Sequence, residues 1–153
     1  MIEETPYWTR IALPALLRHA RTTYGTAMRE ALAEAGCDDV PRNGLYVIGA
    51  LGTGEMPLAE IIQGLGVSKQ AAGQLVDTLV LRGYLGREVD PEDRRRLTVT
   101  LTERGKAAAT AQAAAREAID AALIAHVGEE KVLHAREVLG TLIAIGLEAG
   151  DPE

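Results

Sequence analysis

The feature that most limits the fold is one short stretch of alternating sequence set between long helical patterns. Residues 97–102, LTVTLT, alternate apolar and threonine side chains, which is the period of a half-buried strand. Residues 84–89 form a second strand-like run, and the charged turn DPEDRRR joins the two. The pattern predicts a single β-hairpin in a chain that is otherwise helical.

Helical periodicity covers most of the remaining sequence. Apolar residues recur at three- and four-residue steps over 7–35, and we expect Pro14 to kink this helix. Asp38 and Asp39 are predicted to cap a second helix, with Pro41 in its first turn. Further helices are expected at 58–65, 69–82, 103–126 and 129–148. Thr102 is predicted to cap the helix at 103–126, and the buried stripe expected for the helix at 69–82 is Ala72, Leu75, Val76 and Leu79. The expected fold class is therefore mainly α with a small β-hairpin.

Size and composition fit one globular domain. The chain has 153 residues, of which 47% are hydrophobic and 25% charged. No apolar run is long enough to cross a bilayer, and the N-terminus MIEETPYWTR lacks the features of a signal peptide. The single cysteine, Cys37, excludes an internal disulfide framework. We therefore expect a cytoplasmic protein without a membrane partner.

Charge is distributed unevenly along the chain. The formal net charge is −6, which by itself argues against a nucleic-acid partner. Between Gly64 and Lys106, however, eight Lys and Arg residues face six Asp and Glu residues. This segment is basic within an acidic chain, and a partner that touches one face responds to the local charge.

The basic segment begins with the pattern of a helix-turn-helix. A short helix, a glycine turn and a helix capped by Ser68 follow one another, and the second helix of this motif enters the DNA major groove by its N-terminal end. Gly73 lowers helix stability, so either DNA approaches the backbone closely there or the glycine packs against another element. The candidate DNA-binding residues of this helix are Ser68, Lys69, Gln70, Gly73 and Gln74.

The hairpin that follows has the position of a wing beside the recognition helix. Three consecutive arginines at its tip are placed to reach phosphates or a narrow minor groove, and Asp93 is spaced to orient Arg95. The alternative is a solvated turn, which is what most charge runs are. The candidate wing residues are Asp93, Arg94, Arg95 and Arg96.

The segment from Leu65 to Gly105 closely resembles the MarR family of winged helix-turn-helix regulators. The matching residues are Leu75-Val76-Asp77 and Leu79 in the recognition helix, the RGY break, the wing pattern D-P-x-D-R-R, and the strand that runs into LTERG. Gly73 and Gln74 depart from the family, which often has Thr or Ser and then Arg at these positions. The lower positive charge reduces the share of affinity expected from phosphate contacts.

The resemblance implies one MarR-like domain over 1–153, with a DNA-binding lobe at 38–104. Residues 5–36 and 105–150 would then be dimerisation helices of a homodimer on a roughly palindromic DNA site. It further implies that Arg95 enters the minor groove, held by Asp93, and Asp77 is interpreted as a surface or salt-bridging residue. Many members release DNA when a small phenolic or aromatic ligand binds between the dimer helices and the lobe.

Other features were weighed against this interpretation. The aromatic residues Trp8, Tyr24 and Tyr46 are candidates for an effector pocket or plain core residues. Cys37 follows a helix end and is interpreted as a small buried residue rather than a redox sensor. The histidines have no ligand spacing and no catalytic pattern stands out, so we expect no metal, no cofactor and no enzyme activity. Open alternatives are a winged-helix protein-interaction module and a DNA-binding regulator without ligand response.

Overall fold

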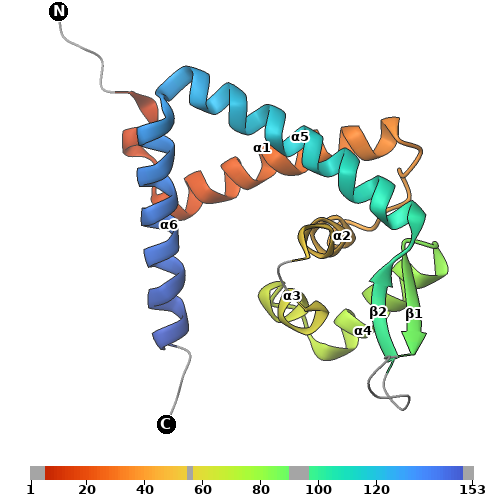
Figure 1. The fold of residues 1–153 in the computed structure, drawn as a ribbon. Coiled ribbons are helices and arrows are strands. Elements are labelled where there is room, and N and C mark those ends of the chain that lie inside the picture. The colour runs from red at the N-terminus through yellow and green to blue at the C-terminus, as the bar shows by residue number, and fades with distance from the viewer. Residues whose placement is uncertain (1–5, 55–56, 90–96, 150–153) are drawn as a thin grey trace, which may run out of the picture. The chain divides into compact units, whose positions relative to one another are not determined.

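The computed structural model describes residues 6–54, 57–89 and 97–149. The chain forms two compact units, Met1–Arg116 and Glu117–Glu153, and each is described by itself. The elements are a short 3-10 helix Tyr7–Arg10, α1 Leu13–Glu34, α2 Gly44–Thr53, α3 Leu58–Gly64, α4 Lys69–Leu81, β1 Leu85–Val89, β2 Leu97–Leu101, α5 Glu103–Val127 and α6 Glu129–Ala149 (Figure 1). This order confirms the predicted fold class.

The predicted hairpin is present between α4 and α5. Strands β1 and β2 pair antiparallel, with Arg87 opposite Val99 and Leu85 opposite Leu101. They form a two-stranded sheet, and the tip that joins them lies outside the described residues. In Figure 1 the hairpin continues directly from the end of α4 and leads into the start of α5.

Two predictions about the N-terminal part of the chain were wrong. The first helix was expected to begin at Tyr7 and to kink at Pro14, but α1 begins at Leu13 with Pro14 in its first turn. Proline fits that position because the first amides of a helix have no carbonyl partner inside it. Residues 7–10 form the separate 3-10 helix instead.

The expected cap of the second helix was also wrong. The residue before α2 is Asn43, which makes no side-chain capping hydrogen bond, and Pro41 precedes the helix. Asp38 is exposed, and the carboxylate of Asp39 binds Tyr84 and Arg104 rather than the backbone of α2. Asp39 was expected to bind the nearby backbone of α2, but its partners Tyr84 and Arg104 lie far away in sequence.

Unit Met1–Arg116 is built around one apolar core. The largest fully buried side chains come from α1, α2, α4, the segment that begins β1, and α5: Leu32, Leu45, Val47, Ile48, Leu79, Tyr84, Leu85 and the polar Gln112. The predicted apolar stripe of α4 is confirmed, since Ala72, Val76 and Leu79 are buried and Leu75 is half-buried. Burial of this stripe stabilises α4 in a defined orientation on the lobe.

A polar cluster joins segments that are distant in sequence. The hydroxyl of Tyr84 donates a hydrogen bond to Asp39, and Arg104 Nη2 lies 3.0 Å from the same carboxylate. The Arg104 guanidinium also stacks 4.4 Å from the centre of the Tyr84 ring and donates to the carbonyl of Arg82. We call Asp39, Arg82, Tyr84 and Arg104 the Asp39 cluster. It ties the loop before α2 to the end of α4 and the start of α5.

The start of α5 is set by Thr102 and Gly105. The Thr102 hydroxyl accepts a hydrogen bond from the Gly105 amide at 3.0 Å and donates to the carbonyl of Gly83, which confirms the predicted helix cap. Gly105 is buried, and a Cβ on it would lie far inside van der Waals contact with the Tyr84 carbonyl oxygen. A glycine is therefore required where α5 begins beside β1.

Unit Glu117–Glu153 contains the end of α5 and all of α6, separated by Gly128 with a left-handed φ of +85°. Asp120 and Arg136 are 3.9 Å apart across these two helices. None of the described residues of α6 is buried in the single chain. None of the helices in the described ranges is both long enough and apolar enough to span a membrane.

Replacement of Gly105 tests the close approach at the start of α5. Gly105→Ala should lower the free energy of unfolding by about 1–3 kcal/mol, because α5 must move away from Tyr84. The measurement is urea unfolding at one fixed protein concentration, since association contributes to apparent stability. The matched control is Gly73→Ala, at an open helical position, which should stabilise the protein. Equal stability of Gly105→Ala and wild type would contradict the packing described here.

The charge of Asp39 should make stability depend on pH. The hydrogen bond from Tyr84, with the guanidiniums of Arg104 and Arg82 nearby, lowers the pKa of Asp39 below its usual value despite some opposing desolvation. A carboxylate with a lowered pKa stabilises the fold above the pKa of the unfolded chain, about 3.9, and this contribution is lost as pH falls through the folded value. Asp39→Asn keeps the shape but not the charge. Its stability deficit in urea unfolding should be largest at neutral pH and should shrink below about pH 4. A deficit that is the same at both pH values would rule out the charge as its origin.

Candidate nucleic-acid interface

The candidate recognition helix is held at its N-terminal end by Ser68. The Ser68 side chain accepts a hydrogen bond from the Ala71 amide at 3.2 Å, so the predicted cap is confirmed. The short helix α3 precedes it, with Ile61 buried toward the core. In Figure 1 helices α3 and α4 and the hairpin follow one another in the same lobe, which is the arrangement of a winged helix-turn-helix.

All five residues predicted to read DNA on α4 are exposed to solvent. They are Ser68, Lys69, Gln70, Gly73 and Gln74. The buried residues of α4 lie on its opposite side, so packing of the helix leaves this face free. The first turn of α4 contains no acidic residue, and the N-terminal end of a helix carries a partial positive charge. The face therefore combines hydrogen-bond donors with a favourable field for phosphate.

Gly73 does not pack against a neighbouring element. No atom of a neighbouring element lies within 4 Å of where its Cβ would stand, among the residues that the structure describes. Its backbone is helical and needs no positive φ. Packing against a neighbouring element therefore does not explain the glycine. Close approach of a partner to the helix is the explanation that remains of the two.

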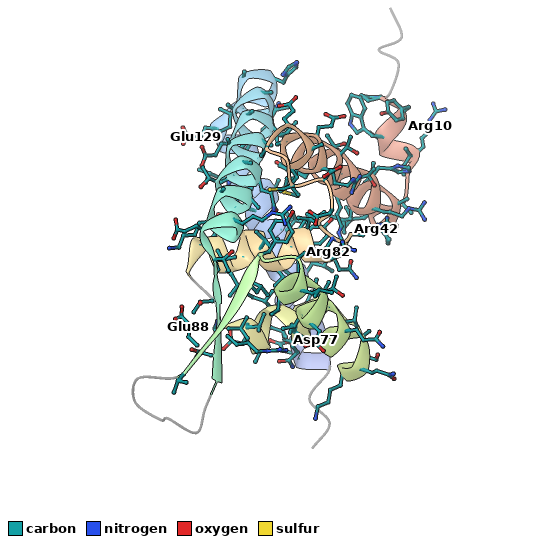
Figure 2. The ribbon with its side chains drawn as sticks, turned by 90° about the vertical axis from the view of Figure 1, so that its right-hand side faces the viewer. Arg10, Arg42, Asp77, Arg82, Glu88 and Glu129 are labelled. Carbon is teal, nitrogen blue, oxygen red and sulfur yellow. The ribbon has the colours of Figure 1, made fainter. Side chains whose placement is uncertain are left out.

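Asp77 pairs with Arg87, as its interpretation as a salt-bridging residue predicted. The ion pair joins α4 to β1, the first strand of the hairpin. The side chains of Asp77 and Arg87 are 66% and 45% exposed, so the pair contributes little to stability. Its effect is to orient the wing strand relative to the helix. Figure 2 labels Asp77 on α4 and Glu88 on β1.

The candidate wing residues Asp93, Arg94, Arg95 and Arg96 lie outside the described residues. The strands β1 and β2, which precede and follow them in the sequence, are described. The contribution of the four residues to DNA binding stays a prediction.

The predicted effector residues are not brought together in one cleft. Trp8 is 53% exposed in the short 3-10 helix and contacts Tyr7 edge to face, at 5.4 Å between ring centres. Tyr24 is half-buried in α1. Tyr46 lines a cleft of about 360 Å³ between α1 and the start of α2. Cys37, weighed as a redox residue, is buried and makes its contact with the carbonyl of Ala35.

The cleft at Tyr46 contains arginines that sequence reasoning missed. Its lining consists of Arg18, Arg21, Thr22, Gly25 and Arg29 from α1, Arg42 and Asn43 from the segment that leads into α2, and Tyr46 from the first turn of α2. We call it the arginine cleft. Residues 18, 21 and 29 repeat at helical spacing, so charge patterning along α1 was an available signal. Arg42 joins them only through the fold.

A second cleft, of about 730 Å³, lies between α2, β2 and the first turns of α5. Its walls are mostly small or apolar, and they include Val99, Leu101, Ala109 and Ala113. Lys106 and Arg116 stand at its edge, and Lys106 is paired with Glu103 at 2.7 Å. This cleft adjoins the base of the hairpin.

The helix-turn-helix followed by a two-stranded wing defines a winged-helix protein. Residues 38–96 match the model of the MarR family. Over this segment the chain is similar to proteins of the MarR family. No curated protein is similar enough in sequence to give a match.

Similar solved structures cover nearly the whole chain. MepR of S. aureus in a DNA complex is 18% identical, with 88% of this chain and 98% of that chain covered and a TM-score of 0.67. NadR in complex with 4-hydroxyphenylacetate is 19% identical, with 93% and 97% covered and a TM-score of 0.67. MepR bound to ethidium bromide is 17% identical, with 89% and 97% covered and a TM-score of 0.55. At these identities the likeness shows that the fold is shared.

Replacement of Gly73 separates helix stability from partner binding. Gly73→Ala should raise the free energy of unfolding by about 1 kcal/mol, because the site is open and helical. If DNA approaches the helix closely, the same change should weaken DNA binding, measured by fluorescence anisotropy. A variant that gains stability and keeps full DNA affinity would show that the glycine is not needed for close approach.

Proposed function

We propose that the protein is a sequence-specific DNA-binding transcriptional regulator. The observation that carries the proposal is the exposed N-terminal face of α4, with Ser68, Lys69, Gln70 and Gln74 and no acidic residue in the first turn. Glutamine pairs well with adenine in the major groove, and lysine donates to guanine or phosphate. The DNA complex of MepR, a protein of the same fold, supports DNA as the partner.

We propose that the protein acts as a homodimer in the cytoplasm on a roughly palindromic operator. Helix α6 exposes a set of large apolar side chains in the single chain: Leu133, Val138, Leu139, Leu142, Ile143, Ile145 and Leu147. Monomeric proteins rarely expose apolar patches of this kind, and a second copy would cover them. The recognition helices of a dimer would then reach successive major grooves, about 34 Å apart.

We propose further that the protein is a repressor that a small molecule releases from DNA. A ligand has this effect if it binds more tightly to a dimer whose recognition helices are wrongly spaced. The complex of NadR with 4-hydroxyphenylacetate supports a small-molecule partner, and it motivates a phenolic or aromatic acid as the first candidate. Tyr46 is the aromatic residue that we place at the site, in the arginine cleft.

The role of the wing is tested by replacement of Arg95. Arg95→Ala should weaken binding to duplex DNA from upstream of the protein's own gene by about 1–3 kcal/mol, because one charged contact is lost. The dependence of affinity on salt should also become less steep, since fewer counterions are released. The measurement is anisotropy titration at two salt concentrations.

The matched control for Arg95→Ala is Arg10→Ala, which removes the same charge from the short 3-10 helix outside the winged helix. It should bind DNA like wild type. If Arg95→Ala bound DNA with the same affinity as wild type, the assignment of Arg95 as a DNA contact of the wing would be wrong. Equal and weak binding of the wild type to this DNA and to an unrelated duplex, with retained binding to a protein partner, would favour the protein-interaction module instead.

A further inference from the structure

The arginine cleft has an unusual charge for this chain. The protein carries six more acidic than basic residues, yet four arginines and no acidic residue line this one cleft. Within the described residues, none of the four guanidiniums lies within salt-bridge distance of a carboxylate. Arg18 and Arg21 are like charges three residues apart on α1, a spacing at which side chains are neighbours, so this pair does not favour the helix by itself.

Contacts inside the cleft hold part of this charge in place. Arg21 Nε donates a hydrogen bond to the Tyr46 hydroxyl at 3.1 Å, and its guanidinium carbon lies 4.5 Å from the centre of the Tyr46 ring. Arg29 Nη2 is 3.4 Å from the Thr26 hydroxyl. The Tyr46 oxygen accepts from Arg21, so its own proton is free to point toward a ligand. Because these side chains are already held, binding a ligand costs less side-chain entropy than it would with freely rotating arginines.

The floor of the cleft is a buried glycine. Gly25 lies in the middle of α1, where glycine is unfavourable, and its backbone is helical. A Cβ at this position would stand 3.4 Å from Arg29 Nη1 and 3.5 Å from the Tyr46 hydroxyl oxygen. The missing side chain keeps open the space between the arginine and the tyrosine.

The remaining two arginines have no described role in the fold. The side chains of Arg18 and Arg42 are exposed and make no hydrogen bond or ion pair in the part of the chain that the structure describes. Figure 2 shows Arg42 beside α1, where its side chain reaches solvent. The cleft therefore offers two fixed and two free guanidiniums, which donate hydrogen bonds and accept none.

We infer that the arginine cleft binds a small anion with at least two negative charges, such as a phosphate ester or a polycarboxylate. The inference rests on the proposed function, because it concerns the effector at the same cleft, and it replaces the phenolic or aromatic acid as first candidate with a doubly charged anion. A guanidinium binds two oxygens of a carboxylate or phosphate in a fork, so the single carboxylate of a phenolic acid satisfies one arginine. A doubly charged ligand engages arginines from both α1 and the segment that leads into α2. A cationic ligand such as the ethidium bound by MepR does not fit this cleft.

The test is isothermal titration calorimetry of the full chain with pyrophosphate, citrate and 4-hydroxyphenylacetate at constant ionic strength. Pyrophosphate or citrate should bind more tightly than the phenolic acid, and the comparison of the two separates phosphate from carboxylate ligands. Arg42→Gln should weaken that binding by about tenfold or more, which is the loss of one charge-assisted contact. Its matched control is Arg10→Gln, which should bind like wild type.

Three calorimetric outcomes would overturn the inference: no heat with either polyanion, equal or tighter binding of 4-hydroxyphenylacetate, or binding to Arg42→Gln that is indistinguishable from binding to wild type. A loss of ligand-free DNA affinity in Arg42→Gln would also overturn it, because the cleft would then be a DNA contact. Calorimetry is done without DNA, so the site is tested apart from the proposed function. If a polyanion binds through Arg42 but leaves DNA affinity unchanged, the anion site stands and release from the operator fails.

Discussion

The carboxylate of Asp39 is the point on which the geometry of the DNA-binding lobe depends. It receives the Tyr84 hydroxyl from the start of the wing and the Arg104 guanidinium from the first turn of α5. Arg82, at the end of the recognition helix, donates to the backbone carbonyl of the same residue. Tyr84 is buried, and burial together with the bond to Asp39 raises the pKa of its phenol, so it remains a donor. Through its carboxylate and its backbone carbonyl, Asp39 thus connects the start of the hairpin, the first turn of α5 and the end of α4.

Local signals were enough to predict the elements of this lobe. Ser68 is a strong cap, the apolar stripe of α4 has helical spacing, and the threonine alternation of β2 has the period of a strand. Thr102 was recognised as a cap because a polar residue stood directly before a helical pattern. Each of these signals lies within a few residues of the structure that it determines, so a single sequence contains all the information needed.

Contacts between distant segments were not predicted. Asp39 looked like a helix cap because aspartate often is one, and its true partners are 45 and 65 residues away. The break between the 3-10 helix and α1 was missed because apolar residues continue across it. The arginine cleft was missed in part for the same reason, since Arg42 meets the arginines of α1 only after folding. Of the candidate site, the face of α4 was predicted, while the wing arginines lie outside the described residues.

The close approach of Gly105 to Tyr84 bears on what can be cut out of this protein. The segment that carries the family signature ends at residue 96, before Thr102, Arg104 and Gly105. Those three residues supply the hydroxyl between α5 and the wing, the cation on Asp39 and the gap that lets the helix start beside β1. A fragment limited to residues 38–96 would lose them, and the Tyr84–Asp39 pair would be left without Arg104. The segment that matches the family model is thus not a transplantable module, and a graft into another protein has to carry the first turn of α5 with it.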